Sequence, residues 1–99
     1  MSNSAENAIS EDAVVELYKQ YRFQWEQAQD CFVLLYPEGM VKLPGSAGEI
    51  MKRVNGQNNV SQIVADLETT FPGADLRQDV IDFLEAAHAN GWIRQQDSK

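Results

Sequence analysis

The chain has 99 residues and a net charge of −7, from 15 acidic and 8 basic side chains. This length fits a single small domain, and no apolar run approaches the ~20 residues that cross a membrane. The excess of acid disfavours binding to nucleic acid, which depends on a basic face.

The N-terminal segment, residues 1–18, is expected to be flexible. Residues 1–9 are small and polar, with neither the basic start nor the apolar stretch of a signal peptide. Ser10 is a candidate cap, followed by two acids and by apolar side chains at helical spacing, so a short helix over residues 10–18 is an alternative. Since there is no export signal and Cys31 is the only cysteine, the expected location is the reducing cytoplasm.

Three strand-like runs come next. Residues 21–26 alternate large apolar and polar side chains, residues 31–36 form a continuous apolar run, and residues 40–43 form a third, shorter one. Turn residues separate them at 27–30 and at Pro37-Glu38-Gly39. Short turns make consecutive strands antiparallel, so the pattern predicts a three-stranded antiparallel meander with open edges.

Three helices are predicted after the strands. Each begins with two residues at the spacing of a capping box, opens an apolar stripe of helical period, and ends at a turn. The order of elements predicts an α+β, winged-helix-like domain over residues 19–94, with the meander followed by a three-helix bundle, and a frayed tail at 95–99. The three capping pairs are Ser46 with Glu49, Asn59 with Gln62, and Asp75 with Gln78.

The sequence holds no recognisable catalytic or metal-binding pattern. Cys31 lies inside an apolar strand and is interpreted as a small buried hydrophobe. His88 is the only histidine, and no further ligand accompanies it. The segment from Pro44 to Gly48 lacks the lysine and the glycine spacing of a phosphate-binding loop. We therefore expect no enzymatic activity, no metal and no cofactor.

The third predicted helix carries a row of acids at positions i, i+4, i+7 and one turn beyond. This row is either a solvated face or a surface that steers a basic partner. A DNA-reading winged helix would place this helix against phosphate, which four carboxylates would repel, so nucleic-acid binding is the weaker alternative. The row consists of Asp75, Asp79, Asp82 and Glu85.

From Tyr21 to Ile93 the chain resembles the PqqD family of pyrroloquinoline quinone (PQQ) biosynthesis proteins. The run from Leu34 to Leu43 is the most specific part of the likeness, and residues 1–18 lie outside it. The segments that carry it are Arg22-Phe-Gln-Trp-Glu26, Val33-Leu-Leu-Tyr-Pro-Glu-Gly-Met-Val-Lys-Leu43, Ser46-Ala-Gly-Glu-Ile50, Asp79-Val-Ile-Asp-Phe-Leu84 and Gly91-Trp-Ile93.

This resemblance implies a peptide chaperone with no catalytic residues, a recognition element for ribosomally made, modified peptides. It would bind the precursor peptide PqqA and present it to the radical S-adenosylmethionine enzyme PqqE. In similar modules the peptide pairs with the third strand and lies against the third helix. The implied peptide-binding residues are Met40, Val41, Lys42 and Leu43 of the strand, and Val80, Phe83, Leu84 and Ala87 of the helix.

Two alternatives stay open. The protein could be a non-catalytic activator subunit that touches only the enzyme and never the peptide, or, less plausibly in view of its charge, a nucleic-acid reader. For the apolar helix positions, core packing competes with peptide contact, and for Val80 and Leu84 the two interpretations are equally strong.

Overall fold

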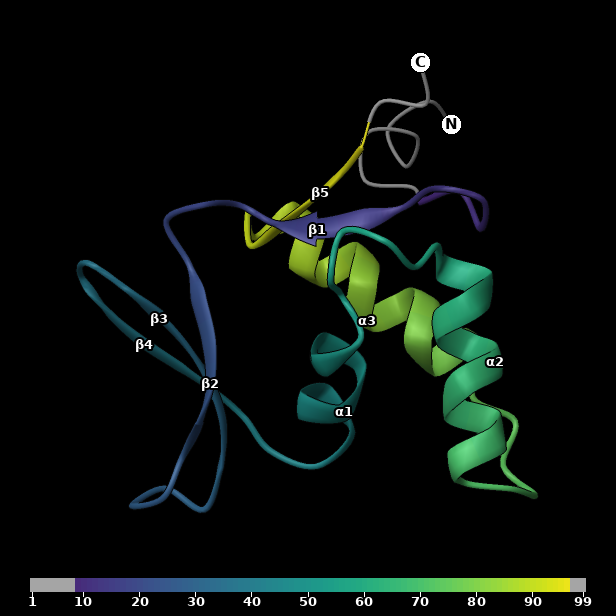
Figure 1. Cartoon of the computed structure of the whole chain (residues 1–99), viewed down its shortest axis with the longest axis horizontal. Helices are drawn as coiled ribbons and strands as arrows, with labels where there is room; N and C mark the ends of the chain where they lie inside the picture. Colours follow the sequence, from purple (N-terminus) through teal and green to yellow (C-terminus); the bar gives the residue numbers. More distant parts are fainter. Residues whose placement is uncertain (1–8, 97–99) are drawn as a thin grey trace.

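The structure is a computed structural model that describes residues 9–96, in which three helices lie beside a three-stranded sheet and a two-stranded sheet. In Figure 1 the three-stranded sheet stands to one side of the helices, and the strands β1 and β5 lie across one end of them. The elements in chain order are β1 (Val15–Leu17), β2 (Arg22–Glu26), β3 (Cys31–Tyr36), β4 (Gly39–Leu43), α1 (Ser46–Lys52), α2 (Val60–Thr70), α3 (Arg77–Ala89) and β5 (Ile93–Gln95).

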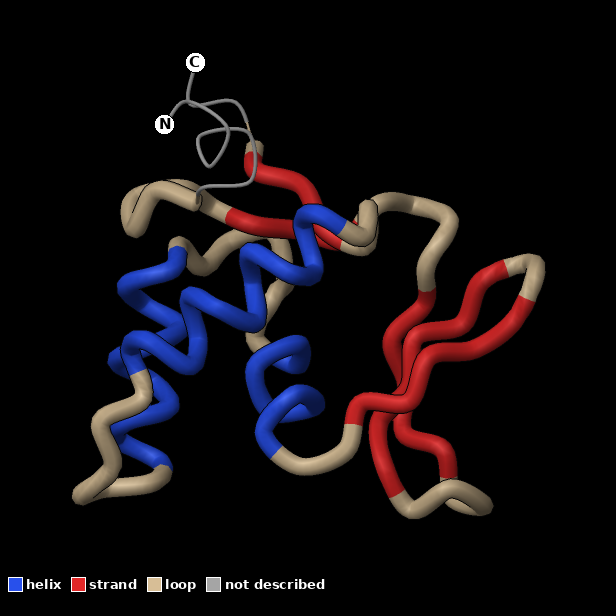
Figure 2. Tube along the Cα trace, turned by 180° about the vertical axis from the view of Figure 1, so that it is seen from behind, coloured by secondary structure: helices blue, strands red, loops and turns tan. Residues whose placement is uncertain are grey.

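The predicted meander is confirmed: β2 pairs with β3 and β3 with β4, both antiparallel. The register aligns Phe23, Leu34 and Val41 across the three strands. Because side chains alternate between faces, this row lies on one face, and it packs on the main core, with Leu34 fully buried. Figure 2 shows the sheet from behind, connected to the helices through the segment after β4.

One close approach holds this sheet against the first helix. A Cβ atom placed on Gly48 of α1 would lie 2.7 Å from the carbonyl oxygen of Leu43 and 2.9 Å from Cδ2 of Phe32. Only a residue without a side chain lets the helix and the sheet pack this tightly. The contact fixes the position of α1 relative to β3 and β4.

Of the three predicted capping boxes, the one at α2 is confirmed. The Asn59 side chain accepts a hydrogen bond from the Gln62 N–H, and the Gln62 side chain accepts one from the Asn59 N–H, both at 2.8 Å. At α1 the residue preceding the helix is Gly45, whose φ of 61° suits glycine, so Ser46 is already helical and forms no cap.

The third box is also absent, because α3 begins one residue later than the pattern predicts. Leu76 precedes the helix, and its N–H donates to the Glu68 carboxylate of α2 at 3.1 Å. A side chain from a neighbouring helix therefore satisfies a backbone donor at the start of α3.

The N-terminal segment is not the short helix that the sequence allowed over residues 10–18. It turns after Ser10 and then forms β1, which pairs antiparallel with β5. The backbone of Val15, a fully buried residue, also accepts from the Gly56 N–H at 3.0 Å, so the α1–α2 loop binds the strand on its other side. Backbone partners far away in the sequence thus stabilise an extended conformation.

The C-terminal tail is likewise ordered further than predicted. Gln95 belongs to β5, and the Gln96 side-chain amide donates to Glu16 Oε1 and to the Gly56 carbonyl, each at 2.9 Å. The parts of the two terminal predictions that fall on residues 1–8 and 97–99 lie outside the described residues. No helix within residues 9–96 is long and apolar enough to cross a bilayer.

Candidate functional site: a strand edge and a pocket between the helices

The outer strand β4 leaves one backbone edge without a partner strand in the described part of the chain. The β3–β4 register closes on the pair Tyr36–Gly39 across a two-residue turn, which makes that pair hydrogen-bonded. Since hydrogen-bonded pairs recur at every second residue, Val41 faces β3, whereas Met40 and Lys42 direct their N–H and C=O groups outward. We call this surface the β4 edge.

The four predicted strand residues divide according to the face on which they lie. The side chains of Met40 and Lys42 are exposed, with Met40 39% accessible. Val41 is half-buried and Leu43 is buried in the core. An added strand would therefore meet the backbone of Met40 and Lys42 but little of the Leu43 side chain.

The predicted α3 residues are mostly closed off from solvent. Val80, Leu84 and Ala87 belong to the buried core, whereas Phe83 is half-buried and packs against that core. Contact of Leu84 and Ala87 with a peptide would require α3 to move, so their role in binding stays a prediction. Phe83 keeps accessible surface in the structure as it stands.

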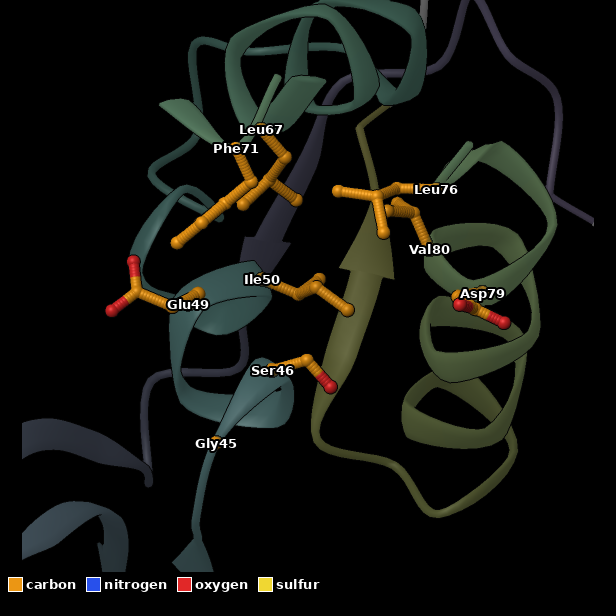
Figure 3. Close-up of a pocket in the computed structure, with 9 residues that line it drawn as sticks. All are labelled: Gly45, Ser46, Glu49, Ile50, Leu67, Phe71, Leu76, Asp79 and Val80. Atoms are coloured by element: carbon orange, nitrogen blue, oxygen red, sulfur yellow. The ribbon is translucent and has the colours of Figure 1, made fainter. Parts of the chain in front are cut away.

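A pocket of about 440 Å³ lies between α1, the end of α2 and the start of α3. In Figure 3 the Ile50 side chain points toward the space between the Leu67–Phe71 pair on one side and the Leu76–Val80 pair on the other. We call it the helix pocket; its lining residues are Gly45, Ser46, Glu49, Ile50, Leu67, Phe71, Leu76, Asp79 and Val80.

Sequence reasoning missed the helix pocket, although it found most of its apolar residues. Ile50, Leu67 and Phe71 recur at helical spacing in the sequence, and such periodicity identifies the apolar face of a helix but not a gap within it. One signal was available: Phe71 is the last apolar residue before the Pro72-Gly73 turn, where little remains to cover it. The structure leaves this ring 44% exposed.

Two carboxylates belong to the lining, Glu49 on α1 and Asp79 on α3, and no basic side chain does. Glu49 is already paired, because Arg53 donates to its carboxylate at 3.1 Å and to its backbone oxygen at 2.8 Å. Among the described residues, no basic side chain forms an ion pair with the exposed Asp79. The available negative charge of the helix pocket therefore lies on the α3 side.

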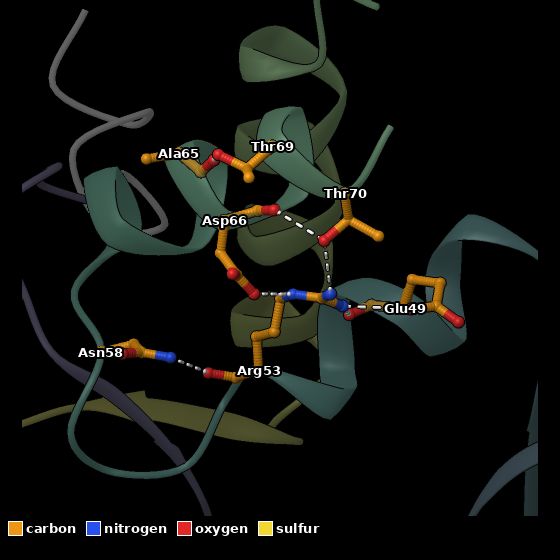
Figure 4. A network of polar contacts seen from close by, with 7 residues as sticks. All are labelled: Glu49, Arg53, Asn58, Ala65, Asp66, Thr69 and Thr70. Carbon is orange, nitrogen blue, oxygen red and sulfur yellow. Dashed lines mark hydrogen bonds and ion pairs between the residues drawn. The ribbon is translucent and has the colours of Figure 1, made fainter. Parts of the chain in front are cut away.

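Arg53 also connects α1 and α2, which line the helix pocket opposite α3. Its guanidinium pairs with Asp66 of α2 and reaches the Thr70 hydroxyl at 3.4 Å (Figure 4). Burial works against the charge of Arg53, but its hydrogen bonds to Asp66 and Glu49 outweigh this and raise the pKa above its usual value. The network holds α1 against α2.

The residues considered for chemistry lie apart from both surfaces. Cys31 is buried in β3, and His88 is half-buried near the end of α3, with its Nδ1 atom unpaired. Within residues 9–96, no three His, Cys, Asp or Glu side chains gather closely enough to hold a metal ion.

The fold is that of a recognition element for ribosomally synthesised and post-translationally modified peptides. It matches the solution NMR structure of the PqqD truncation of Methylobacterium extorquens PqqCD, described as a functional and stand-alone element of this kind. The TM-score is 0.74 at 26% sequence identity, and the match covers 95% of this chain and 99% of the other.

Sequence similarity identifies the family to which the chain belongs within this fold. A family model described as coenzyme PQQ synthesis protein D (PqqD) matches residues 31–93, and the chain belongs to this family. It is 55% identical over 86 residues to a PqqA binding protein of Pseudomonas paraeruginosa, covering 86% of this chain and 94% of that protein. A PqqA binding protein of Methylococcus capsulatus is 41% identical over 88 residues, covering 89% of this chain and 95% of that protein.

Proposed function

We propose that this protein binds the PqqA precursor peptide by strand addition at the β4 edge and presents it to the radical S-adenosylmethionine enzyme PqqE. Its relatives carry the name PqqA binding protein, which describes binding and not catalysis. The observation that carries the binding mode is the outward-facing backbone of Met40 and Lys42. The protein itself contributes no chemical step.

Backbone pairing alone does not account for a stable complex. Met40 and Lys42 offer two donors and two acceptors, and each hydrogen bond contributes about 0.5–1.5 kcal/mol net. Ordering a flexible peptide costs about 2–5 kcal/mol, which roughly cancels that gain. Micromolar affinity, about −8 kcal/mol, therefore needs peptide side chains that bury apolar surface. Met40, Val41 and Phe83 are the apolar predicted residues that keep accessible surface for such contacts.

A cytoplasmic location is consistent with binding of a precursor peptide. We place the protein in the cytoplasm, because its one cysteine is buried in β3 as a free thiol, which suits a reducing compartment.

The test is a calorimetric titration of the full chain with the synthetic PqqA precursor of Pseudomonas aeruginosa, using variants of the strand edge. Lys42→Pro removes an outward donor at an edge, where proline is tolerated, and should abolish binding in a folded protein. Lys42→Ala keeps the donor and should bind nearly as well as the wild type. Val41→Pro removes a bond to β3 and should destabilise the sheet itself.

The opposite edge provides a matched control. By the same alternation, Trp25 of β2 directs its backbone away from β3. Trp25→Pro should therefore bind the peptide as Trp25→Ala does. Full binding by folded Lys42→Pro would reject strand addition at β4, and no binding by the wild type would favour the activator that touches only the enzyme.

A further inference from the structure

We propose that the helix pocket is an anchor site for one large apolar side chain of the bound peptide, and that Asp79 selects a Lys or Arg beside that anchor. This inference rests on the proposed peptide binding and adds to it a second point of recognition, away from the β4 edge. None of the residues of β4 lines the helix pocket, and Val80 is the one lining residue that the predicted strand–helix groove shares with it.

The size and lining of the helix pocket favour an apolar anchor. Its volume of about 440 Å³ falls in the range of ligand-binding clefts, about 300–1,000 Å³. Five of its side chains are hydrocarbon, and the Phe71 ring among them remains 44% exposed. An exposed aromatic wall beside a concave apolar floor is the arrangement that buries a partner's aromatic or branched side chain.

Chain continuity indicates that the peptide is the occupant. The helix pocket begins at Gly45 and Ser46, which follow the last residue of β4 after a single proline. A peptide that extends along β4 at about 3.3 Å per residue and continues past Leu43 comes next to these two residues. The same extended segment can therefore pair with the β4 edge and place a side chain between the helices.

The charge of the pocket lining indicates which peptide residue lies next to the apolar anchor. Asp79 is exposed and has no basic partner within the described residues, while Arg53 pairs with the other lining carboxylate, Glu49. Asp82, one turn further along α3, accepts from the Gln78 amide at 2.8 Å and does not line the helix pocket. A cation next to the anchor therefore meets Asp79 first.

The experiment uses the full chain and the Pseudomonas aeruginosa PqqA precursor peptide in calorimetric titrations. Ser46→Phe fills the helix pocket from an exposed position, and its control is Ala65→Phe, an exposed position of α2 outside the lining. We expect Ser46→Phe to lower the affinity more than about tenfold, the scale of one buried hot-spot contact, and Ala65→Phe to leave it unchanged.

A second variant covers the case in which Ser46→Phe disturbs the fold. Phe71→Ala removes the exposed wall and should weaken binding, whereas Trp25→Ala removes an equally exposed ring outside the lining and should not. Thermal melting of each sample separates loss of folding from loss of binding.

The charge is tested by a pair of neutral variants. Asp79→Asn should weaken binding by up to about fivefold, as for an exposed ion pair, and Asp82→Asn should not. Each basic residue of the peptide is also replaced singly by Gln. One of these replacements should weaken binding to the wild-type protein but cause no further loss of affinity for Asp79→Asn. Peptide binding that is equal in all variants and controls would overturn the inference while the proposed function stands. A wild-type protein that binds no peptide would overturn both.

Discussion

Phe83 is the predicted peptide-binding residue of α3 that keeps accessible surface while it packs on the core. It projects from the same helix as the buried Val80, Leu84 and Ala87, yet it stays half-buried where they are closed off. A half-buried side chain stabilises the free protein with only part of its surface. The remaining part is accessible without any movement of α3.

We therefore expect Phe83→Ala to separate stability from binding. Truncation of a wholly buried phenylalanine costs about 3–5 kcal/mol of stability, and the loss here should be smaller because part of the ring is already solvated. The affinity for the PqqA peptide should fall more than tenfold, equivalent to about 1.4 kcal/mol. Thermal unfolding and calorimetric titration of the same sample give both values. A folded variant that binds as well as the wild type would show that the peptide does not reach Phe83.

At the scale of single elements, local sequence signals differ in what they determine. Asn59 and Gln62 form their reciprocal cap because α2 starts where the pattern places it. Ser46 and Asp75 have the same spacing to their partners but form no cap, because a glycine turn and the Glu68 carboxylate set those two helix starts instead.

Alanine variants should reveal this difference. Asn59→Ala should lower the free energy of unfolding by about 0.5–2 kcal/mol, as loss of a helix cap does. Asp75→Ala should change it little, since no cap bond is lost. Urea denaturation monitored by circular dichroism measures both, and an equal cost for the two would contradict the caps described here.

The contrast between local signals and contacts made through the fold explains how much of the structure could be predicted from sequence. Local periodicity predicts strands at 21–26, 31–36 and 40–43 and the three helices, and with them an open edge at the third strand. That Met40 and Lys42 direct their backbone outward follows from the β3–β4 register in the structure. The strand β1 could not be found, because Val15 acquires its partner Gln95 only through the fold. The helix pocket was missed for a similar reason: it depends on how three helices lie together, and no single stripe encodes a gap.

The whole molecule combines a strong acidic charge with the two surfaces proposed to recognise the peptide, the β4 edge and the helix pocket. Its net charge of −7 opposes nucleic-acid binding and favours encounters with basic partners. The β4 edge supplies directional but weak pairing, and the helix pocket supplies apolar surface. In the proposed mode of binding, an extended peptide would be recognised both by its backbone and by one or two of its side chains.

For the whole protein we expect no stoichiometric metal and no coloured cofactor. The chain has one histidine and one cysteine, and its described residues hold no cluster of three metal-binding side chains. Elemental analysis and an absorption spectrum of the purified protein check this. Zinc or iron at one equivalent would contradict a purely binding role and reopen the search for chemistry.

The pairing of β1 with β5 bears on how such a domain can be built into larger proteins. The partners Val15 and Gln95 bring the start and the end of the described chain to the same corner, and Gln96 hydrogen-bonds to Val14 at 2.8 Å. Domains with neighbouring ends tolerate fusion at either terminus, or insertion into a loop, because the host chain enters and leaves at one place. The related Methylobacterium domain was itself cut from a longer PqqCD chain. The two-stranded sheet therefore places both ends of the described chain where a single connection to a larger protein could reach them.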